Sequence, residues 1–432
     1  MTEEQILALS PDASSTKSGK DLARMNKWVS VGVDERALWG ECQGSGSNPY
    51  RTQLDLRETA FKCSCPSRKF PCKHGLGLFL LYARQPADFK TVEQPDWVKD
   101  WIGKRAEKQE KKAETAAKPV DEKAQAKRAE ARTSKVTAGL QELELWVKDL
   151  IRNGLITIPG QPGFWEQPAR RMSDAQASGV TTLLTQLGDI NFYKEGWQSE
   201  LLQQLARIYI VAEGFKRIDE LPELMQTDLR SVIGWSMKQE ELKAMEGVSD
   251  NWLILGRQTE REQELTVQRN WLVGEKSGRY ALIINFAFKN QPLDVTLVPG
   301  TAFSGELVFF PGSYPLRAVL KTRDQTAEFV RPEGLADWVA AEDVYSAAVS
   351  AYPWIDRLPM LVKNLALQPF QEEWVLKDSS GRFMFVHEKF DLNWQLLAIG
   401  GGHPLDMMVV REKDKVVPIG VWNRGGYKLL NS

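Results

Sequence analysis

The sequence lacks the features of membrane proteins and of secreted, disulfide-bonded proteins. Its longest apolar run covers residues 76–83, far short of the roughly 20 residues that a membrane-spanning helix needs. The chain begins with acidic residues, Glu3 and Glu4, where a secretory signal would be basic. Only 4 cysteines occur among 432 residues, which does not indicate a disulfide framework. We therefore predict a cytoplasmic protein that does not enter a membrane.

Common catalytic motifs are also missing. The sequence contains no H-E-x-x-H, G-x-S-x-G or G-x-x-x-x-G-K-[ST] pattern, so the signatures of zinc metalloproteases, α/β-hydrolases and P-loop NTPases are absent. Of its 3 histidines, His387 ends a predicted strand and His403 follows three glycines, a run typical of a loop. We assign no catalytic residue and predict that the protein is not an enzyme. An enzyme with a site in the C-terminal half is a weaker alternative.

No strong excess of one charge characterises the whole chain, but its two parts differ. Residues 1–135 hold 25 basic and 19 acidic side chains, a net charge of +6, and the remainder of the chain carries 31 against 38, a net charge of −7. After Ile102, the segment up to residue 135 has Val120 as its only large apolar side chain. It cannot bury an apolar face, so we predict a charged, partly helical linker over residues 99–137. This basic linker is either solvated or in contact with nucleic acid.

A cluster of metal-binding residues is the most informative feature of the sequence. Cys63, Cys65, Cys72 and His74 follow the spacing C-x-C-x6-C-x-H, and three thiolates with one imidazole form the set of a closed, tetrahedral structural zinc site. Cys63 and Cys65, two residues apart, point to one face of an extended segment. Cys72 and His74 would diverge by about 200° on one helix, so we expect Cys72 in the turn before a helix and His74 in its first turn. The sequence predicts a hairpin, a six-residue connection and a helix around one Zn²⁺ ion.

This pattern resembles the SWIM-type zinc finger, a ββα family defined by C-x-C, a variable gap and C-x-H. Further segments resemble its bacterial members, namely residues 38–46, 49–50, 55–56 and 63–67. The resemblance covers about residues 15–90 and implies that Cys63, Cys65, Cys72 and His74 are the ligands, whereas Cys42 lies outside the motif. It also implies binding to DNA or to proteins, with MoxR-type AAA+ ATPases and von Willebrand A proteins as associates of several bacterial members.

The rest of the chain indicates an α+β multidomain protein with a helical middle region and a β-rich C-terminal half. Apolar residues at helical spacing predict helices in the middle region, and short runs rich in β-branched and aromatic residues predict strands after residue 249. Individual predictions include a helix over residues 21–29 and strands at 295–298 and 394–399. The predicted domains are a SWIM-type finger (1–98), the linker (99–137), a helical domain (138–248), a β-rich domain (249–332) and an α+β domain (333–432).

These observations predict a zinc-binding, non-enzymatic adaptor whose finger and tryptophan-rich domains bind a protein; the resemblance implies a partner of the AAA+ ATPase kind. The alternative is a DNA- or RNA-binding protein that uses the finger and the basic linker. The finger's basic side chains either contact phosphates or offset the negative charge of a three-thiolate zinc site; they are Lys62, Arg68, Lys69 and Lys73. Cys42 is expected to be a buried, apolar thiol. The 15 tryptophans either form interfaces or fill the cores.

Overall fold

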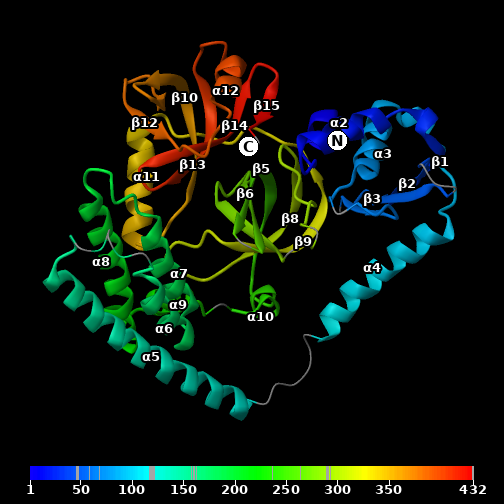
Figure 1. The fold of residues 1–432 in the computed structure, drawn as a ribbon. Coiled ribbons are helices and arrows are strands. Elements are labelled where there is room, and N and C mark those ends of the chain that lie inside the picture. Colours follow the sequence, from blue (N-terminus) through cyan, green and yellow to red (C-terminus); the bar gives the residue numbers. More distant parts are fainter. Residues whose placement is uncertain are drawn as a thin grey trace.

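The structure is a computed structural model that describes residues 1–44, 48–57, 59–67, 69–115, 122–156, 158, 161, 163–235, 237–262, 264–288, 291 and 293–430. An N-terminal sheet with helices, a helical middle region and a β-rich C-terminal half follow one another along the chain (Figure 1). This arrangement confirms the predicted fold class. None of the described helices combines the length and the apolar character that a bilayer crossing requires.

The N-terminal unit is an antiparallel four-stranded sheet with strand order β1-β2-β3-β4. Its strands are β1 (Trp28–Val33), β2 (Ala37–Cys42), β3 (Tyr50–Asp55) and β4 (Ala60–Cys63). Its helices are α1 (Glu3–Leu7), α2 (Ala13–Leu22) and α3 (Lys73–Arg84). Helix α3 contacts β2, β3 and β4 on one side and α1 and α2 on the other. The approach of α2 to α3 requires Gly77, because a Cβ there would lie 2.7 Å from Leu22 Cβ.

The predicted helix over residues 21–29 is wrong. Helix α2 starts earlier, where the Asp12 side chain accepts a hydrogen bond from Ser15 N, and it ends at Leu22. Residues 28–33 form strand β1, which pairs with β2. The alternation of Val29, Val31 and Val33 is the sequence signal for this strand, and cross-strand pairing decides the conformation.

The predicted linker is helical on both sides of residues 116–121, which include Pro119 and Val120 and lie outside the described part of the chain. Helix α4 (Asp96–Thr115) precedes this gap and α5 (Glu122–Asn153) follows it. At the start of α4, Trp101 and Ile102 are buried in a small cluster with Trp39 of β2. The first part of the segment is therefore packed on the N-terminal sheet rather than fully solvated. The predicted domain boundaries stay predictions.

Asp55, at the end of β3, adds a charged contact between this sheet and α4. Its carboxylate is fully buried. Asp55 Oδ2 lies 3.8 Å from Arg36 Nε and 3.7 Å from Arg105 Nε of α4, and Oδ1 accepts a hydrogen bond from Arg57 N at 3.1 Å. The buried carboxylate lies between two guanidinium groups and holds α4 in position. Removing the carboxylate would leave both guanidinium groups partly buried without a counter-charge.

The middle region is a helical bundle around one hydrophobic core. Its helices are α5 (Glu122–Asn153), α6 (Glu166–Asp174), α7 (Ser178–Gln186), α8 (Trp197–Lys216) and α9 (Glu223–Ile233). The short α10 (Gln239–Lys243) follows the bundle and packs against β8 (Ala302–Phe309) and β9 (Ala318–Ala327) of the C-terminal half. Leu143 and Val147 of α5 are buried with Leu201 and Leu205 of α8, which matches the predicted helical spacing. Helices α7 and α9 also touch closely, since a Cβ at Gly179 would lie 1.9 Å from the carbonyl oxygen of Val232.

The C-terminal half contains two sheets that share a core. The five-stranded sheet, in the order β7-β6-β5-β8-β9, consists of β5 (Val248–Glu262), β6 (Leu265–Gly274), β7 (Tyr280–Phe288), β8 (Ala302–Phe309) and β9 (Ala318–Ala327). The second sheet consists of β10 (Leu358–Phe370), β11 (Glu373–Lys377), β12 (Phe383–Val386), β13 (Leu405–Glu412), β14 (Lys415–Asn423) and β15 (Gly426–Leu429). Leu253 and Trp271 of the first sheet are buried in one cluster with Met408 and Ile419 of the second. The two sheets thus stabilise each other across the predicted boundary at residue 332.

Two helices accompany the second sheet, and one of them replaces a predicted strand. They are α11 (Trp338–Ala351), which precedes the sheet in the chain, and α12 (Asn393–Gly400), which contains residues 394–399 of the predicted strand. A short apolar run fits either structure. The helical form buries Leu396 in the core of the second sheet, and this tertiary contact decides the outcome.

A loop of the C-terminal half completes the core of the N-terminal unit. Val295 and Val298, predicted to lie in a strand, are in a loop and are buried in the same cluster as Ile6 of α1. Gln5 Nε2 donates a hydrogen bond to Gly300 O at 2.8 Å. Figure 1 shows the N-terminal helices beside β8 and β9. We call residues 293–300 the clasp loop, because this loop of the five-stranded sheet contacts the N-terminal unit.

Candidate metal centre

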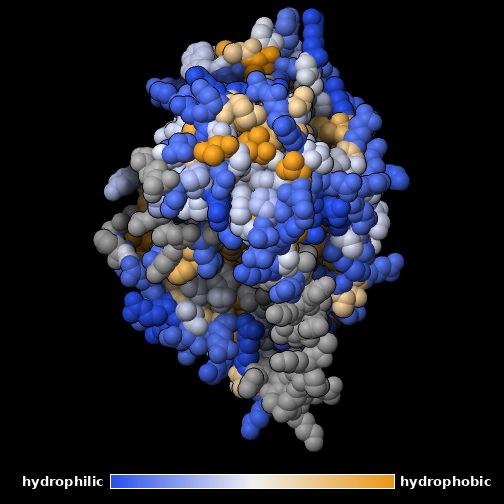
Figure 2. Space-filling view, turned by 90° about the vertical axis from the view of Figure 1, so that its right-hand side faces the viewer, coloured by the Kyte–Doolittle hydropathy of each residue, from blue (hydrophilic) through white to orange (hydrophobic). Residues whose placement is uncertain are grey.

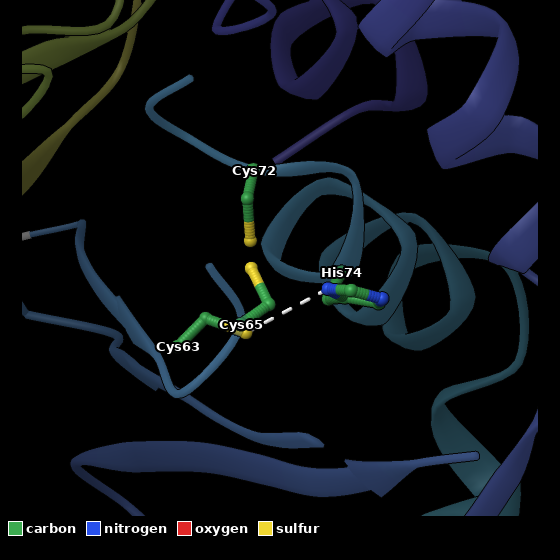
Figure 3. Close-up of side chains that lie close together, drawn as sticks. All are labelled: Cys63, Cys65, Cys72 and His74. Carbon is green, nitrogen blue, oxygen red and sulfur yellow. Dashed lines mark hydrogen bonds between the residues drawn. The ribbon is translucent and has the colours of Figure 1, made fainter. Parts of the chain in front are cut away.

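The four predicted ligands come together in space. One ligand atom each from Cys63, Cys65, Cys72 and His74 lies within 4.8 Å of all the others, and Figure 3 shows the four side chains converging on one point. Cys63 Sγ is 3.7 Å from His74 Nδ1. Zinc bonds of about 2.3 Å to sulfur and about 2.0 Å to nitrogen would place such a pair about 3.5 Å apart at a tetrahedral angle. The donor set and its spacing therefore fit Zn²⁺, with Nδ1 as the nitrogen that faces the metal.

The first two ligands come from the β3–β4 hairpin and the turn that follows it. Cys63 is the last residue of β4 and pairs with Thr52 of β3. The turn is held against β3 by two hydrogen bonds, from Ser64 N to Arg51 O at 2.9 Å and from Arg51 N to Ser64 Oγ at 2.9 Å. These bonds fix the direction in which the chain leaves the strand, so that Cys65 returns to the same point as Cys63.

The other two ligands lie at the start of α3, as predicted. Cys72 is the residue before the helix, with extended backbone angles (φ −74°, ψ 165°), and His74 is the second residue within the helix. The His74 ring packs against Tyr50, with ring centroids 4.9 Å apart. Helix α3 can approach the hairpin because residue 75 is glycine; a Cβ there would lie 2.9 Å from the ring of Phe61.

Thr52 is a site residue that the sequence reasoning missed. Its hydroxyl Oγ1 lies 3.2 Å from Cys63 Sγ, and its side chain is fully buried. A hydroxyl that donates to a ligating sulfur orients the ligand and stabilises the thiolate. The signal for this contact is the register of β3 against β4, which a single sequence does not reveal.

The ligand groups strongly affect one another's protonation. Hydrogen bonds with Cys63 and Cys65, together with burial, raise the pKa of the Cys72 thiol far above its ordinary value, whereas hydrogen bonds with Cys63 and Cys72 lower the pKa of Cys65. Burial lowers the pKa of His74, but its hydrogen bonds to Cys63 and Cys65 outweigh burial and raise it to about 9. Three sulfur atoms this close require shared protons or a cation, so zinc binding releases protons from the cluster.

Comparison with known protein families agrees with this geometry. Residues 50–83, which contain all four ligands, match the family model of the SWIM zinc finger. The chain contains a SWIM zinc finger. Residues 131–233 match the model of the SWIM-associated four-helix bundle domain, which corresponds to the helical middle region. No curated protein and no solved structure matches the chain.

The SWIM finger is a Zn²⁺-binding module whose metal has a structural environment. Cys72 and His74 are buried, with exposed fractions of 7% and 5%, and the other two ligands are half-buried. Three thiolates and one imidazole complete a tetrahedral shell. Such a site holds the hairpin and α3 together and leaves no coordination position for a substrate.

The remaining predicted residues of the SWIM finger have varied environments. Lys62, Lys69 and Lys73 are exposed, and Lys69 Nζ forms an ion pair with Asp12 Oδ2 at 2.8 Å. Arg68 lies outside the described residues. Cys42 is fully buried, as predicted, and burial raises the pKa of its thiol to about 11.

The other two histidines lie far from the SWIM finger along the chain. His387 is one of the residues that line a cavity of about 1250 Å³ between the helical bundle and the two sheets, and its Nδ1 is 3.3 Å from Glu388 Oε2. His403 is exposed in the turn after α12. Among the tryptophans, nine of fifteen are buried, which favours the core interpretation, whereas Trp394 exposes 72% of its surface.

Proposed function

We propose that this protein is a non-enzymatic adaptor whose SWIM finger, shaped by a structural zinc ion, binds a protein partner. The observation that carries the proposal is the closed ligand shell: Cys63, Cys65, Cys72 and His74 provide all four positions of a tetrahedral site. A metal in such a shell organises a surface and has no open position for catalysis. The SWIM-associated bundle adds a second module that can take part in recognition.

The surface of the finger supports a protein partner over nucleic acid. Of the four basic residues around the ligands, Lys69 is paired with Asp12, and Lys62 and Lys73 are exposed. Figure 2 faces this side of the molecule and shows a mixed surface, with a small group of apolar side chains among polar ones. Val29, which exposes 61% of its surface, is one apolar residue of the finger. Mixed surfaces of this kind are typical of non-obligate protein interfaces.

The partner class that we propose is a MoxR-type AAA+ ATPase, together with a von Willebrand A protein. The direct test is isothermal titration of the zinc-loaded chain with the purified ATPase and, separately, with the von Willebrand A protein of the same host. We expect saturable binding that Cys72→Ser abolishes, because the finger loses its metal, and that Cys42→Ala leaves intact. Failure of both proteins to bind the zinc-loaded chain would contradict the proposed partner class.

The alternative, nucleic-acid binding by the finger, predicts a different result. Replacing Lys62 and Lys73 by glutamine would remove up to two phosphate contacts and flatten the dependence of log K on log salt by about 0.7 to 0.9 per contact. An adaptor should bind its protein partner almost unchanged, since exposed charges contribute about 0 to 1 kcal/mol each. A gel shift over a salt series, with this double variant and the parent chain, separates the two.

A further inference from the structure

Five strands of the second C-terminal sheet close into a barrel. Strand β10 pairs with β11 and β13, β11 pairs with β12, and β13 pairs with β14, all antiparallel. Strands β12 and β14 then pair in parallel, with Phe385 opposite Lys415 and Val386 opposite Val416. Helix α12 lies between β12 and β13 in the chain and packs on β10. The five strands β10 to β14 are therefore paired in a closed ring.

This connectivity is that of the five-stranded Greek-key barrel known as the OB-fold: a three-stranded meander, a helix, and a hairpin whose second strand pairs in parallel with the third strand of the meander. In barrels of this type, the outer face of the second and third strands is the usual surface for oligonucleotides and oligosaccharides. The corresponding surface in this protein is the outer face of β11 and β12, bordered by the end of β10.

Three phenylalanine rings form a cluster on this face. The ring centroids of Phe370 and Phe383 are 5.1 Å apart, and Phe385 lies 6.1 Å from the first and 5.6 Å from the second. Phe370 and Phe383 each expose 41% of their surface. Along β12, Val386 points into the barrel core, so Phe385 and Phe383, at alternate positions, face outward. The three rings are not among the residues of the barrel's core cluster.

Two cations that can contact an anionic ligand lie beside the platform. Lys377 pairs with Phe383 in the strand register, and Arg382 is the exposed residue just before β12. Neither side chain has an ion-pair partner among the residues that the structure describes. The acidic groups nearby, Glu373 and Glu388, share one cation, Lys415, whose Nζ is 2.8 Å from the Glu373 carboxylate. Lys377 and Arg382 are therefore the cations left to contact an anionic group, and the exposed Glu372 lies at the adjoining turn.

We infer that this face binds single-stranded nucleic acid. The bases stack on Phe370, Phe383 and Phe385, and the phosphates contact Lys377 and Arg382. Exposed rings beside cations are the combination that sequence-tolerant single-strand binding uses, because every base has a stacking face and every nucleotide a phosphate. A duplex cannot bind in this way, since its bases are already stacked. This site is separate from the zinc finger and does not depend on the protein partner proposed above.

The test is fluorescence anisotropy with the full-length, zinc-loaded chain. The probes are labelled oligo(dT) and oligo(U) of about 20 nucleotides, longer than one barrel's site of about 4 to 16, and a duplex of the same length. We expect single-strand binding that is stronger than duplex binding. Phe383→Ala should weaken it about fivefold or more, and Phe370→Ala/Phe383→Ala further. The two single-strand probes show whether DNA or RNA is preferred.

Matched variants make the result specific to this face. Phe286, on β7 of the other sheet, exposes 55% of its surface, and Phe286→Ala should bind like the parent chain. Phe383→Trp keeps a stacking ring and should restore binding, which separates stacking from a folding defect. Lys377→Gln should reduce the salt slope by about 0.7, the value for one phosphate contact on a single strand.

Several outcomes would overturn the inference. They are the absence of saturable binding to either single strand at low salt, equal binding of the duplex, and equal affinity of the parent chain and the Phe370→Ala/Phe383→Ala variant. Binding that depends on Lys62 and Lys73 but not on the phenylalanines would move the nucleic-acid site to the finger. If the platform binds only protein, neither single strand will show saturable binding, which is the first of these outcomes.

Discussion

Removing zinc from the intact protein is expected to unfold the finger and to release the clasp loop while the two C-terminal sheets persist. Zinc binding contributes about 10 to 16 kcal/mol of apparent free energy in small fingers, as much as the whole net stability of about 5 to 15 kcal/mol of a typical domain. The finger's own apolar contacts do not replace such a contribution. Without the metal, the β3–β4 hairpin and α3 lose the bond network that holds them together.

The clasp loop sets how far this effect spreads. Val295 and Val298 expose only 6% and 1% of their surfaces against the finger's core, and burying each valine is worth about 1.5 to 3 kcal/mol. Loss of the finger should therefore cost the C-terminal half about 3 to 6 kcal/mol at most, and the cost should fall mainly on the loop. The sheets have their own core, which includes Leu253, Trp271 and Met408.

Hydrogen–deuterium exchange measured by mass spectrometry, with and without a strong chelator, tests this expectation. Peptides from β3, β4, α3 and residues 293–300 should lose protection, and peptides from β5 and β6 should keep it. In a Val295→Ala/Val298→Ala variant, exchange in the loop should already be fast with zinc present, whereas Val29→Ala, at an exposed position, should behave like the parent chain. Chelation that left α3 protected, or that exposed β5 and β6, would refute the reasoning.

Three further predictions concern single residues of the finger. Cys63→Ser and His74→Ala should each lower the zinc content from one ion per chain, measured by elemental analysis, whereas Cys42→Ala should keep it; full zinc in both ligand variants would contradict the assignment. Thr52→Val should retain the metal but weaken its affinity about 10- to 100-fold, because Cys63 loses its hydroxyl partner; competition with a chromogenic chelator gives the value, and an unchanged affinity would exclude this role. Asp55→Asn should destabilise the finger by about 1 to 3 kcal/mol in urea unfolding, because two partly buried guanidinium groups lose their counter-charge; an unchanged midpoint would show that solvent screens this contact.

The metal site could be predicted from the sequence because its determinants are local. The ligands span twelve residues, Cys63 to His74, and the two-residue spacing of Cys72 and His74 excludes a single helix face, which places the helix start between them. The long-range features could not be predicted in this way. Val295 and Val298 have strong strand propensity, but their burial depends on a core more than 200 residues away in the chain.

The C-terminal barrel shows the same limit. The apolar residues 394–399 fit a strand or a helix equally well, and only the contact of Leu396 with the barrel core selects the helix. The parallel pairing of Phe385 with Lys415 leaves no trace in the alternation of either strand. Closure of the barrel, and with it the position of the phenylalanine platform, follows from pairings that no single segment encodes.

The clasp loop also imposes an order on how the protein is made. A ribosome completes the finger's ligands and α4 long before it reaches residue 300, about 200 residues later, which takes roughly 10 to 40 seconds at about 5 to 20 residues per second. During that interval the nascent finger can bind zinc, but its core lacks Val295 and Val298, and the surface that they cover is exposed to solvent. The core of the N-terminal unit is therefore completed only after residues 293–300 have been synthesised.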